Sequence, residues 1–187
     1  MTESRELLSI LRDEAGAARA HFHTWWALRN MAIPEYFDTM NNYEFVDFFH
    51  VSNSGNYKLI FISLAKIFDR DSRTAGIVKL KNVLIDEGHQ NLADEITNRL
   101  GKKEELIKKI LRIRNQSISH NQSELPREKV YKINDITPDQ IREVIDETCS
   151  VMNDIASAFG MSTVISDADR LEQATLNMLR QLKNGKT

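Results

Sequence analysis

The scarcity of helix-breaking residues is the feature that most constrains the fold of this chain. Seven glycines and three prolines are spread over 187 residues, so there are few points at which a helix must stop. Apolar residues recur every three or four positions along much of the chain, as on the buried face of an amphipathic helix. We therefore expect an all-α fold, a helical bundle of roughly five to seven helices with at most a short irregular strand near residues 130–133.

Capping residues, glycines and prolines divide the chain into these helices. Pro34 ends the first of them, and Gly88 and Gly101 end two short ones. Thr137, as N-cap, and Pro138, in the first turn, start the helix expected over residues 138–159. The expected helices cover approximately residues 3–31, 42–70, 75–87, 91–100, 102–119, 138–159 and 166–182.

Length and composition favour a single globular domain. A chain of this length can bury one sizeable hydrophobic core, and 41% apolar with 28% charged residues is an ordinary globular balance. We expect one all-helical domain over residues 1–183, with its core centred on Leu59–Phe68, and a frayed tail at 184–187.

Several classes of protein are excluded by what the sequence lacks. No apolar run approaches the roughly 20 residues of a membrane span, and the N-terminus is charged, so we expect a cytoplasmic protein without membrane contact. Cys149 is the only cysteine; an internal disulfide and a multi-cysteine zinc site are therefore excluded, and we expect the thiol to be buried. His21 and His23 are two positions apart and face different sides of a helix. We expect neither a metal nor a cofactor.

The basic residues suggest that any nucleic-acid site is local. The net charge is −2 and the pI about 6.2, so the surface as a whole is not of the kind that binds polyanions. Residues 102–114 nevertheless carry six basic side chains against two acidic ones. Lys108, Lys109 and Arg112 lie on the solvated face of that helix, and we expect them to contact RNA.

The segment RIRNQSISHNQSE, residues 112–124, turns an arginine toward the apolar face of the same helix. At about 100° per residue, Arg114 and Ser117 fall within an arc formed by Leu106, Ile107, Ile110, Leu111, Ile113 and Ile118. An unpaired buried guanidinium is costly. Arg114 therefore pairs with a carboxylate such as Asp69 or Asp71, reaches solvent, or lines a cleft.

His120 follows Arg114 by six positions, and the two residue types suit phosphodiester chemistry. A histidine is the natural general base near neutral pH, and an arginine holds the negative charge that develops on phosphorus. Six residues of regular helix separate the two by about 9 Å and about 120°, so either the helix unwinds near Ser119 or a second copy completes the site. A two-fold homodimer through the apolar face would bring both pairs into one groove.

The segment RNQSISH resembles the signature of HEPN domains, in which an arginine, a polar residue and a later histidine lie near a helix end. Two flanking segments are similar to the abortive-infection AbiU-like branch of that superfamily, over roughly Ala18–Phe159: LIFISLAKIFDRDSRTAGIVKLKNVL and YKINDITPDQIREVIDE. The resemblance implies an all-α bundle, usually a homodimer. In active members it implies a metal-independent endoribonuclease of phage defence or toxin–antitoxin systems, whose partners are RNA and an antitoxin or operon protein.

The same resemblance implies roles for individual residues. Arg114 and His120 match the catalytic pair, and Asn115 matches the polar position after the arginine. The ribose 2′-hydroxyl would attack the neighbouring phosphorus, His120 would move the proton, and Arg114 would stabilise the charge, giving a 2′,3′-cyclic phosphate. Ser117, on the same face, and Asp69, as an orienting carboxylate, are supporting candidates.

Two departures from the family keep a second interpretation open. Asn121 and Gln122 follow His120, so the tyrosine that HepT-type toxins present there, and that their antitoxin modifies, is absent. The acidic net charge fits members without nuclease activity. The alternative is a non-catalytic HEPN-like dimeric module that binds a protein, RNA or nucleotide partner, with Arg114 and His120 as a structural network. An unrelated helical interaction protein is the third hypothesis.

Overall fold

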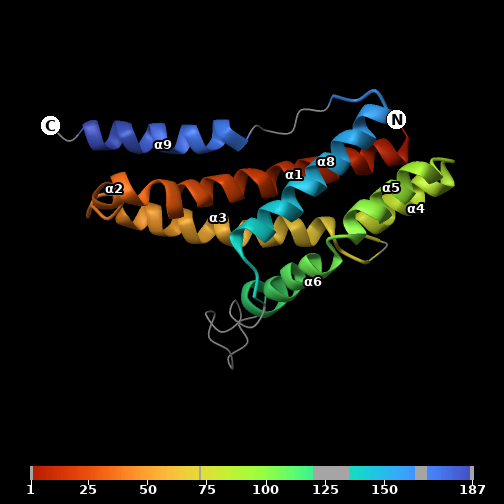
Figure 1. The fold of residues 1–187 in the computed structure, drawn as a ribbon, viewed down its shortest axis with the longest axis horizontal. Coiled ribbons are helices and arrows are strands. Elements are labelled where there is room, and N and C mark those ends of the chain that lie inside the picture. Colours follow the sequence, from red (N-terminus) through yellow and green to blue (C-terminus); the bar gives the residue numbers. More distant parts are fainter. Residues whose placement is uncertain (1, 72, 120–134, 163–167, 186–187) are drawn as a thin grey trace. The chain divides into compact units, whose positions relative to one another are not determined.

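The computed structural model describes residues 2–71, 73–119, 135–162 and 168–185, and Figure 1 shows how they are arranged in helices. The expected all-α fold is confirmed, because the described residues form eight α-helices and two π-helical turns, and no strand. Residues 130–133, where a short strand was expected, lie outside the described residues. The elements are α1 (Glu3–Trp26), η1 (Ala27–Met31), α2 (Ile33–Met40), α3 (Val46–Ile67), α4 (Ile77–Asp86), α5 (Gln90–Gly101), α6 (Glu104–Ile113), η2 (Arg114–Ser119), α8 (Pro138–Ala158) and α9 (Ala168–Asn184).

No helix in the described part of the chain combines the length and the apolar character needed to cross a membrane.

The chain forms two compact units, and α1 and α3 each contribute to both. The first unit comprises residues 1–18 and 61–165, and the second comprises residues 19–60 and 166–187. The expectation of one domain over residues 1–183 stays a prediction.

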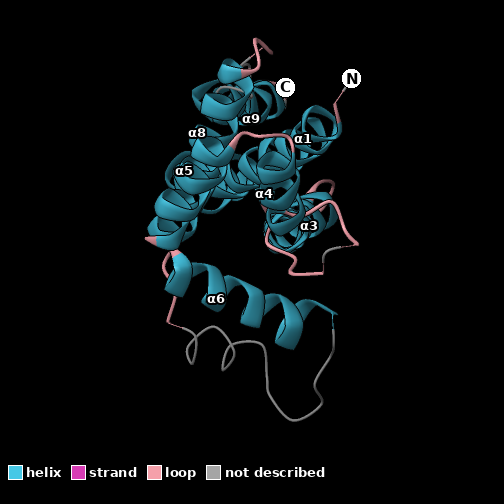
Figure 2. Cartoon of the chain, turned by 90° about the vertical axis from the view of Figure 1, so that its right-hand side faces the viewer, coloured by secondary structure: helices cyan, strands magenta, loops and turns pink. Residues whose placement is uncertain are grey.

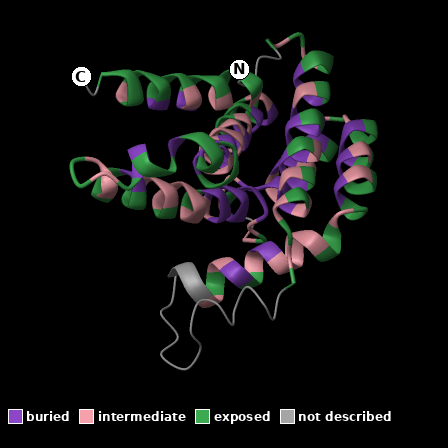
Figure 3. Ribbon diagram, turned by 60° about the vertical axis from the view of Figure 1, so that its left-hand side comes forward, coloured by how far each residue is buried: buried purple, intermediate pink, exposed green. Residues whose placement is uncertain are grey.

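In the first unit, α5 packs against both α4 and α8 (Figure 2). The helix α6 also packs against α8. The expected core centre in the second half of α3 is confirmed, because Phe61, Leu64 and Ile67 are fully buried. Cys149 is also buried, as expected, with its sulfur 3.6 Å from the carbonyl oxygen of Ala15. Figure 3 shows the buried positions, and further fully buried side chains of this unit are Leu8, Leu11, Leu80, Leu84, Ile96, Ile110 and Ile113.

In the second unit, α9 packs against η1 and α2. His23 Nδ1 lies 2.6 Å from Glu172 Oε1 on α9, and His21 Nδ1 lies 2.8 Å from Asn56 Oδ1 on α3. The two histidines therefore contact different helices, in agreement with their spacing of two positions. The core of the unit consists of Leu28, Ala32, Tyr36, Met40, Phe49 and Leu179.

The helix ends follow local chemistry. Thr137 and Gln140 form a reciprocal capping box at the start of α8, with Pro138 in its first turn, as expected. Gly88, after α4, has a φ of 84°, and Gly160, after α8, a φ of 63°. Both glycines adopt the left-handed conformation that ends helices and that disfavours other residues.

The first helix ends differently from the expectation. The chain passes from α1 into η1, where the Ala32 amide donates to the Ala27 carbonyl at 2.8 Å, and it re-enters an α-helix at Ile33. Pro34 lies in the first turn of α2. A proline fits that position because the first-turn amides have no partner within the helix.

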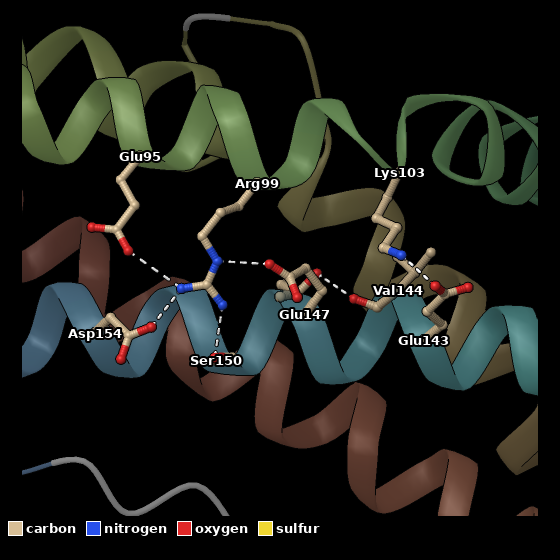
Figure 4. Close-up of polar contacts among 9 residues, drawn as sticks. Glu95, Arg99, Lys103, Glu143, Val144, Glu147, Ser150 and Asp154 are labelled. Carbon is tan, nitrogen blue, oxygen red and sulfur yellow. Dashed lines mark hydrogen bonds and ion pairs between the residues drawn. The ribbon is translucent and has the colours of Figure 1, made fainter.

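Arg99 is a polar link between α5 and α8 (Figure 4). Its Nε donates to Glu147 at 2.7 Å, its Nη1 to Asp154 at 2.5 Å, and its Nη2 to Ser150 at 2.8 Å. Glu147, Ser150 and Asp154 follow one another at intervals of three and four positions, so the three acceptors lie on one face of α8. The hydrogen bond to Glu147 is the largest of the contacts that raise the pKa of Arg99 above its ordinary value.

We expect Arg99→Met to lower the free energy of unfolding by about 1–3 kcal/mol, because the apolar stem remains while hydrogen bonds to carboxylates are lost. Urea denaturation followed by circular dichroism measures the change. The matched control is Arg73→Met, since Arg73 is exposed and pairs only at the surface with Asp71, at 2.6 Å. We expect this control to unfold as the wild type does, because an exposed ion pair contributes little to stability. Equal effects of the two variants would contradict the role of Arg99.

Candidate functional site

The expected site lies on α6 and its π-helical continuation η2. Glu104 and Glu105 occupy the first turn of α6, where the helix dipole favours negative charge. The helix changes from α to π geometry at Arg114. Hydrogen bonds in a π-helix span five residues instead of four, and such turns are frequent at functional sites. The regular 100° spacing therefore ends at Ile113.

The apolar face of α6 is only partly covered. Ile110 and Ile113 are fully buried, whereas Ile107 and Leu111 are half-buried. These two half-buried residues line an open cleft of about 310 Å³, together with residues of α4 and α5 such as Ile96. The helix α6, here called the motif helix because it leads into the RNQSISH segment, therefore presents apolar surface that α4, α5 and α8 do not cover.

Arg114 is half-buried at the start of η2. Its Nη1 donates to Asn115 Oδ1 at 2.8 Å, so the two residues that the signature pairs are in direct contact. Among the described residues Arg114 has no ion pair. Within the described part of the chain, the guanidinium therefore meets a neutral amide oxygen and no carboxylate.

The two carboxylates proposed as partners of Arg114 have other partners. Asp69 Oδ1 accepts a hydrogen bond from the Asp71 amide at 3.0 Å. Asp71 Oδ2 accepts one from Arg73 at 2.6 Å, and this contact lowers the pKa of Asp71. The described residues therefore contain no ion pair of Arg114 with Asp69 or Asp71. The proposed orienting role of Asp69 stays a prediction.

The three basic residues expected to contact RNA differ in their surroundings. Lys108 pairs with Glu105 at 2.8 Å and with Glu104 at 3.2 Å, and these contacts raise its pKa. Lys109 Nζ donates to the backbone carbonyl of Asp135 at 2.8 Å. Arg112 is exposed and has no ion pair among the described residues. Arg112 is therefore the most available of the three cations.

Two of the expected site residues fall where the structure describes no side chain. His120 lies outside the described residues, and Ser117 belongs to η2 by its backbone alone. The distance between Arg114 and His120 stays a prediction.

The second unit contains a cluster that the analysis of the sequence did not identify as functional. Trp25 and Arg29 meet residues of α3, among them His50 and Tyr57, at an open cleft. Trp25 is half-buried and faces this cleft. The spacing of these residues in the sequence could have indicated the cluster. Trp25 and Arg29 are four positions apart, as residues on one face of a helix are. His50 and Tyr57 are seven positions apart, which is two helical turns.

The loop that carries Asp69 is closely packed. A Cβ atom on Gly76 would lie 2.7 Å from the backbone carbonyl oxygen of Asp69. That contact is shorter than van der Waals packing allows, and backbone cannot move away as a flexible side chain can. Gly76 therefore holds the Asp69 carbonyl in its place before α4.

We expect Gly76→Ala to lower the free energy of unfolding by about 1–3 kcal/mol, because overpacking forces the Asp69 loop to shift. Gly101→Ala is the control, since a Cβ there meets nothing within 4 Å at the end of α5. We expect that control to be neutral or stabilising by up to about 1 kcal/mol. Thermal denaturation of both variants measures the difference, and a neutral Gly76→Ala would show that the loop is not constrained.

One comparison with known proteins identifies a family for the chain. The sequence model of the HEPN family described as AbiU2 matches residues 1–176 of the chain. The matched region includes the motif helix, η2 and most of both compact units. No curated protein and no solved structure matches the chain.

Proposed function

The chain belongs to the AbiU2 family of HEPN domains, and on this premise we propose that it is a metal-independent endoribonuclease that acts in phage defence or a toxin–antitoxin system. The observation that carries the proposal is the state of Arg114. This arginine lies at the start of a π-helical turn, contacts Asn115, and has no carboxylate partner in the described part of the chain. A half-buried cation without a carboxylate is suited to hold a phosphate.

The proposed reaction is an internal transesterification of RNA. The ribose 2′-oxygen bonds to the neighbouring phosphorus while the bond from phosphorus to the 5′-oxygen breaks, giving a 2′,3′-cyclic phosphate and a free 5′-hydroxyl. His120 moves the proton from the 2′-hydroxyl to the departing 5′-oxygen, and Arg114 stabilises the charge on the phosphoryl oxygens. Asn115 positions the guanidinium through its 2.8 Å contact. Ser117 and Asp69 are proposed as supporting residues.

RNA binding would use the cations on the outer side of the motif helix. Arg112 is exposed and available, and Lys109 adds charge beside it. Lys108 contributes less, because Glu104 and Glu105 offset its charge. Binding is therefore expected to weaken as salt rises, since phosphate contacts release counterions.

A homodimer would complete the site. Ile107 and Leu111 are half-buried along the cleft beside α6, and a two-fold partner would cover them and place two copies of Arg114 and His120 in one groove. An antitoxin or operon partner protein is a further expected partner of this surface.

We expect Leu111→Glu to shift the protein from dimer to monomer, because a charge would enter the apolar interface. Sedimentation velocity at micromolar concentration measures the state, and circular dichroism verifies the fold. Ile85→Glu is the matched control, since Ile85 is 43% exposed on α4 and does not line the cleft. A wild-type protein that sediments as a monomer would contradict the proposed dimer.

The nuclease test uses purified protein, Arg114→Ala and His120→Ala, incubated in EDTA with single-stranded and transfer RNA. We expect the wild type to leave 2′,3′-cyclic phosphate ends, and each substitution to slow cleavage by about 100-fold or more. Arg73→Ala is the control, because Arg73 is an exposed arginine that pairs with Asp71 outside the proposed site.

Two results would overturn the nuclease proposal. Equal cleavage by all variants would identify a contaminant. A folded wild type that cleaves nothing would favour the alternative, a non-catalytic HEPN-like dimeric module that binds a protein, RNA or nucleotide partner. The pairing of Lys108 with two carboxylates favours that alternative, because it weakens the positive patch.

A further inference from the structure

The second unit carries two neighbouring clefts that share Arg29, His50 and Asn53. The first, here called the aromatic cleft, has a volume of about 280 Å³ and is completed by Trp25, Ser54 and Tyr57. The second, here called the apolar cleft, has a volume of about 200 Å³ and includes Leu28, Ile33, Phe37, Met40, Val46 and Phe49. The shared polar residues therefore form a strip with a cleft on each side.

Helical spacing brings these side chains together. Trp25 lies at the end of α1, and Arg29 lies four positions later in η1. His50, Asn53 and Tyr57 follow one another at intervals of three and four on α3, so they share one face of that helix. The π-helical turn sets where Arg29 points relative to Trp25, and π-turns of this kind are frequent at functional sites.

The aromatic cleft has a surface on which a planar ring can stack. The ring centroids of Trp25 and Tyr57 are 4.9 Å apart, with an angle of 39° between the planes. The rings are in contact, so a planar ligand would lie over them and not between them. Both side chains are half-buried, and each retains exposed area for such a ligand.

The strip between the clefts is positively charged. Arg29 and His50 are exposed and have no ion pair among the residues that the structure describes. Among the described residues no aspartate or glutamate lines either cleft, although acidic residues outnumber basic ones in the chain, 27 against 25. The Arg29 guanidinium supplies a permanent positive charge and His50 a ring N–H donor, and with no carboxylate among the lining residues this strip favours an anionic group.

We infer that the two clefts bind a dinucleotide step of a single-stranded nucleic acid. One base stacks on Trp25 and Tyr57, the next enters the apolar cleft, and the phosphate between them contacts Arg29 and His50. A free mononucleotide would fill only one cleft, whereas base, phosphate and base match both clefts and the strip. This site lies in the second unit, and its binding does not depend on the proposed cleavage by Arg114 and His120.

Tryptophan fluorescence reports on this site directly, because Trp25 and Trp26 are the only two tryptophans of the chain. In a Trp26→Phe background, Trp25 is the sole tryptophan. The probes are a 2′-O-methyl tetraadenylate, which has no 2′-hydroxyl to attack phosphorus, the matching DNA, adenosine monophosphate and adenosine. We expect saturable quenching by a strand, with an affinity at least about fivefold above the mononucleotide, and little or none by adenosine. The strand that binds with the higher affinity shows whether the site prefers the ribose or the deoxyribose sugar.

Variants separate stacking from phosphate contact. We expect Tyr57→Ala to weaken strand affinity about fivefold or more through lost stacking. Arg29→Gln is expected to weaken it and to reduce the slope of log affinity against log salt by about 0.7. The matched control is Arg180→Gln, an exposed arginine on α9 of the same unit whose Nη1 bonds Asn177, and this variant should bind as the parent does.

Two outcomes would overturn the inference. One is the absence of saturable quenching by either strand in a protein with native circular dichroism, and the other is equal affinity in Arg29→Gln and Arg180→Gln. Because the modified strand cannot be cleaved, a protein without nuclease activity can pass this test. An active nuclease can equally fail it, so the two proposals are tested separately.

Discussion

Each helix of this chain must bury one apolar stripe, and the rest of the structure depends on how completely it does so. In α8 the burial is extensive, since Ile141, Val144 and Ile145 in its first half and Val151, Met152 and Ile155 in its second are all covered. In α6 only Ile110 and Ile113 are fully covered. Burial is the largest favourable term in folding, so α8 contributes mainly to the core, while part of the apolar face of α6 stays uncovered among the described residues.

The arginines of the two proposed sites both lie in π-helical turns. A turn that bonds over five residues changes which face the following side chains occupy. Arg29 lies within η1 and Arg114 begins η2. A regular helical wheel places Arg114 within the apolar arc, and its amide still donates to the Ile110 carbonyl four residues earlier. Arg114 is half-buried because the apolar face of α6 is only partly covered, and the π-helical register changes the faces of the residues after it.

The arginines of the described residues divide into two groups by their partners. Arg99 is surrounded by Glu95, Glu147 and Asp154, and it joins two helices of one unit. Arg29 and Arg114 have no carboxylate partner in the described part of the chain. In a chain with a slight excess of acidic residues, a cation that forms no internal ion pair is available to an external anion. The net charge of the chain sums arginines with and without carboxylate partners, so it does not show which of them can bind an anion. The contrast between the two groups does, and it supports both the proposed cleavage at Arg114 and the proposed binding at Arg29.

The sequence by itself determined the all-α class, most helix boundaries and the family. Those features are local: Thr137 caps the amides next to it, Gly88 supplies a positive φ, and apolar spacing identifies each buried face. Only the tertiary structure decided the partners of the charged groups and the shape of the clefts. Arg99 pairs with Glu147 of another helix, 48 positions away, and Trp25 meets Tyr57 from a different helix. Such contacts join residues that are distant in the chain or depend on a change of hydrogen-bond register, and helical periodicity carries no information about either.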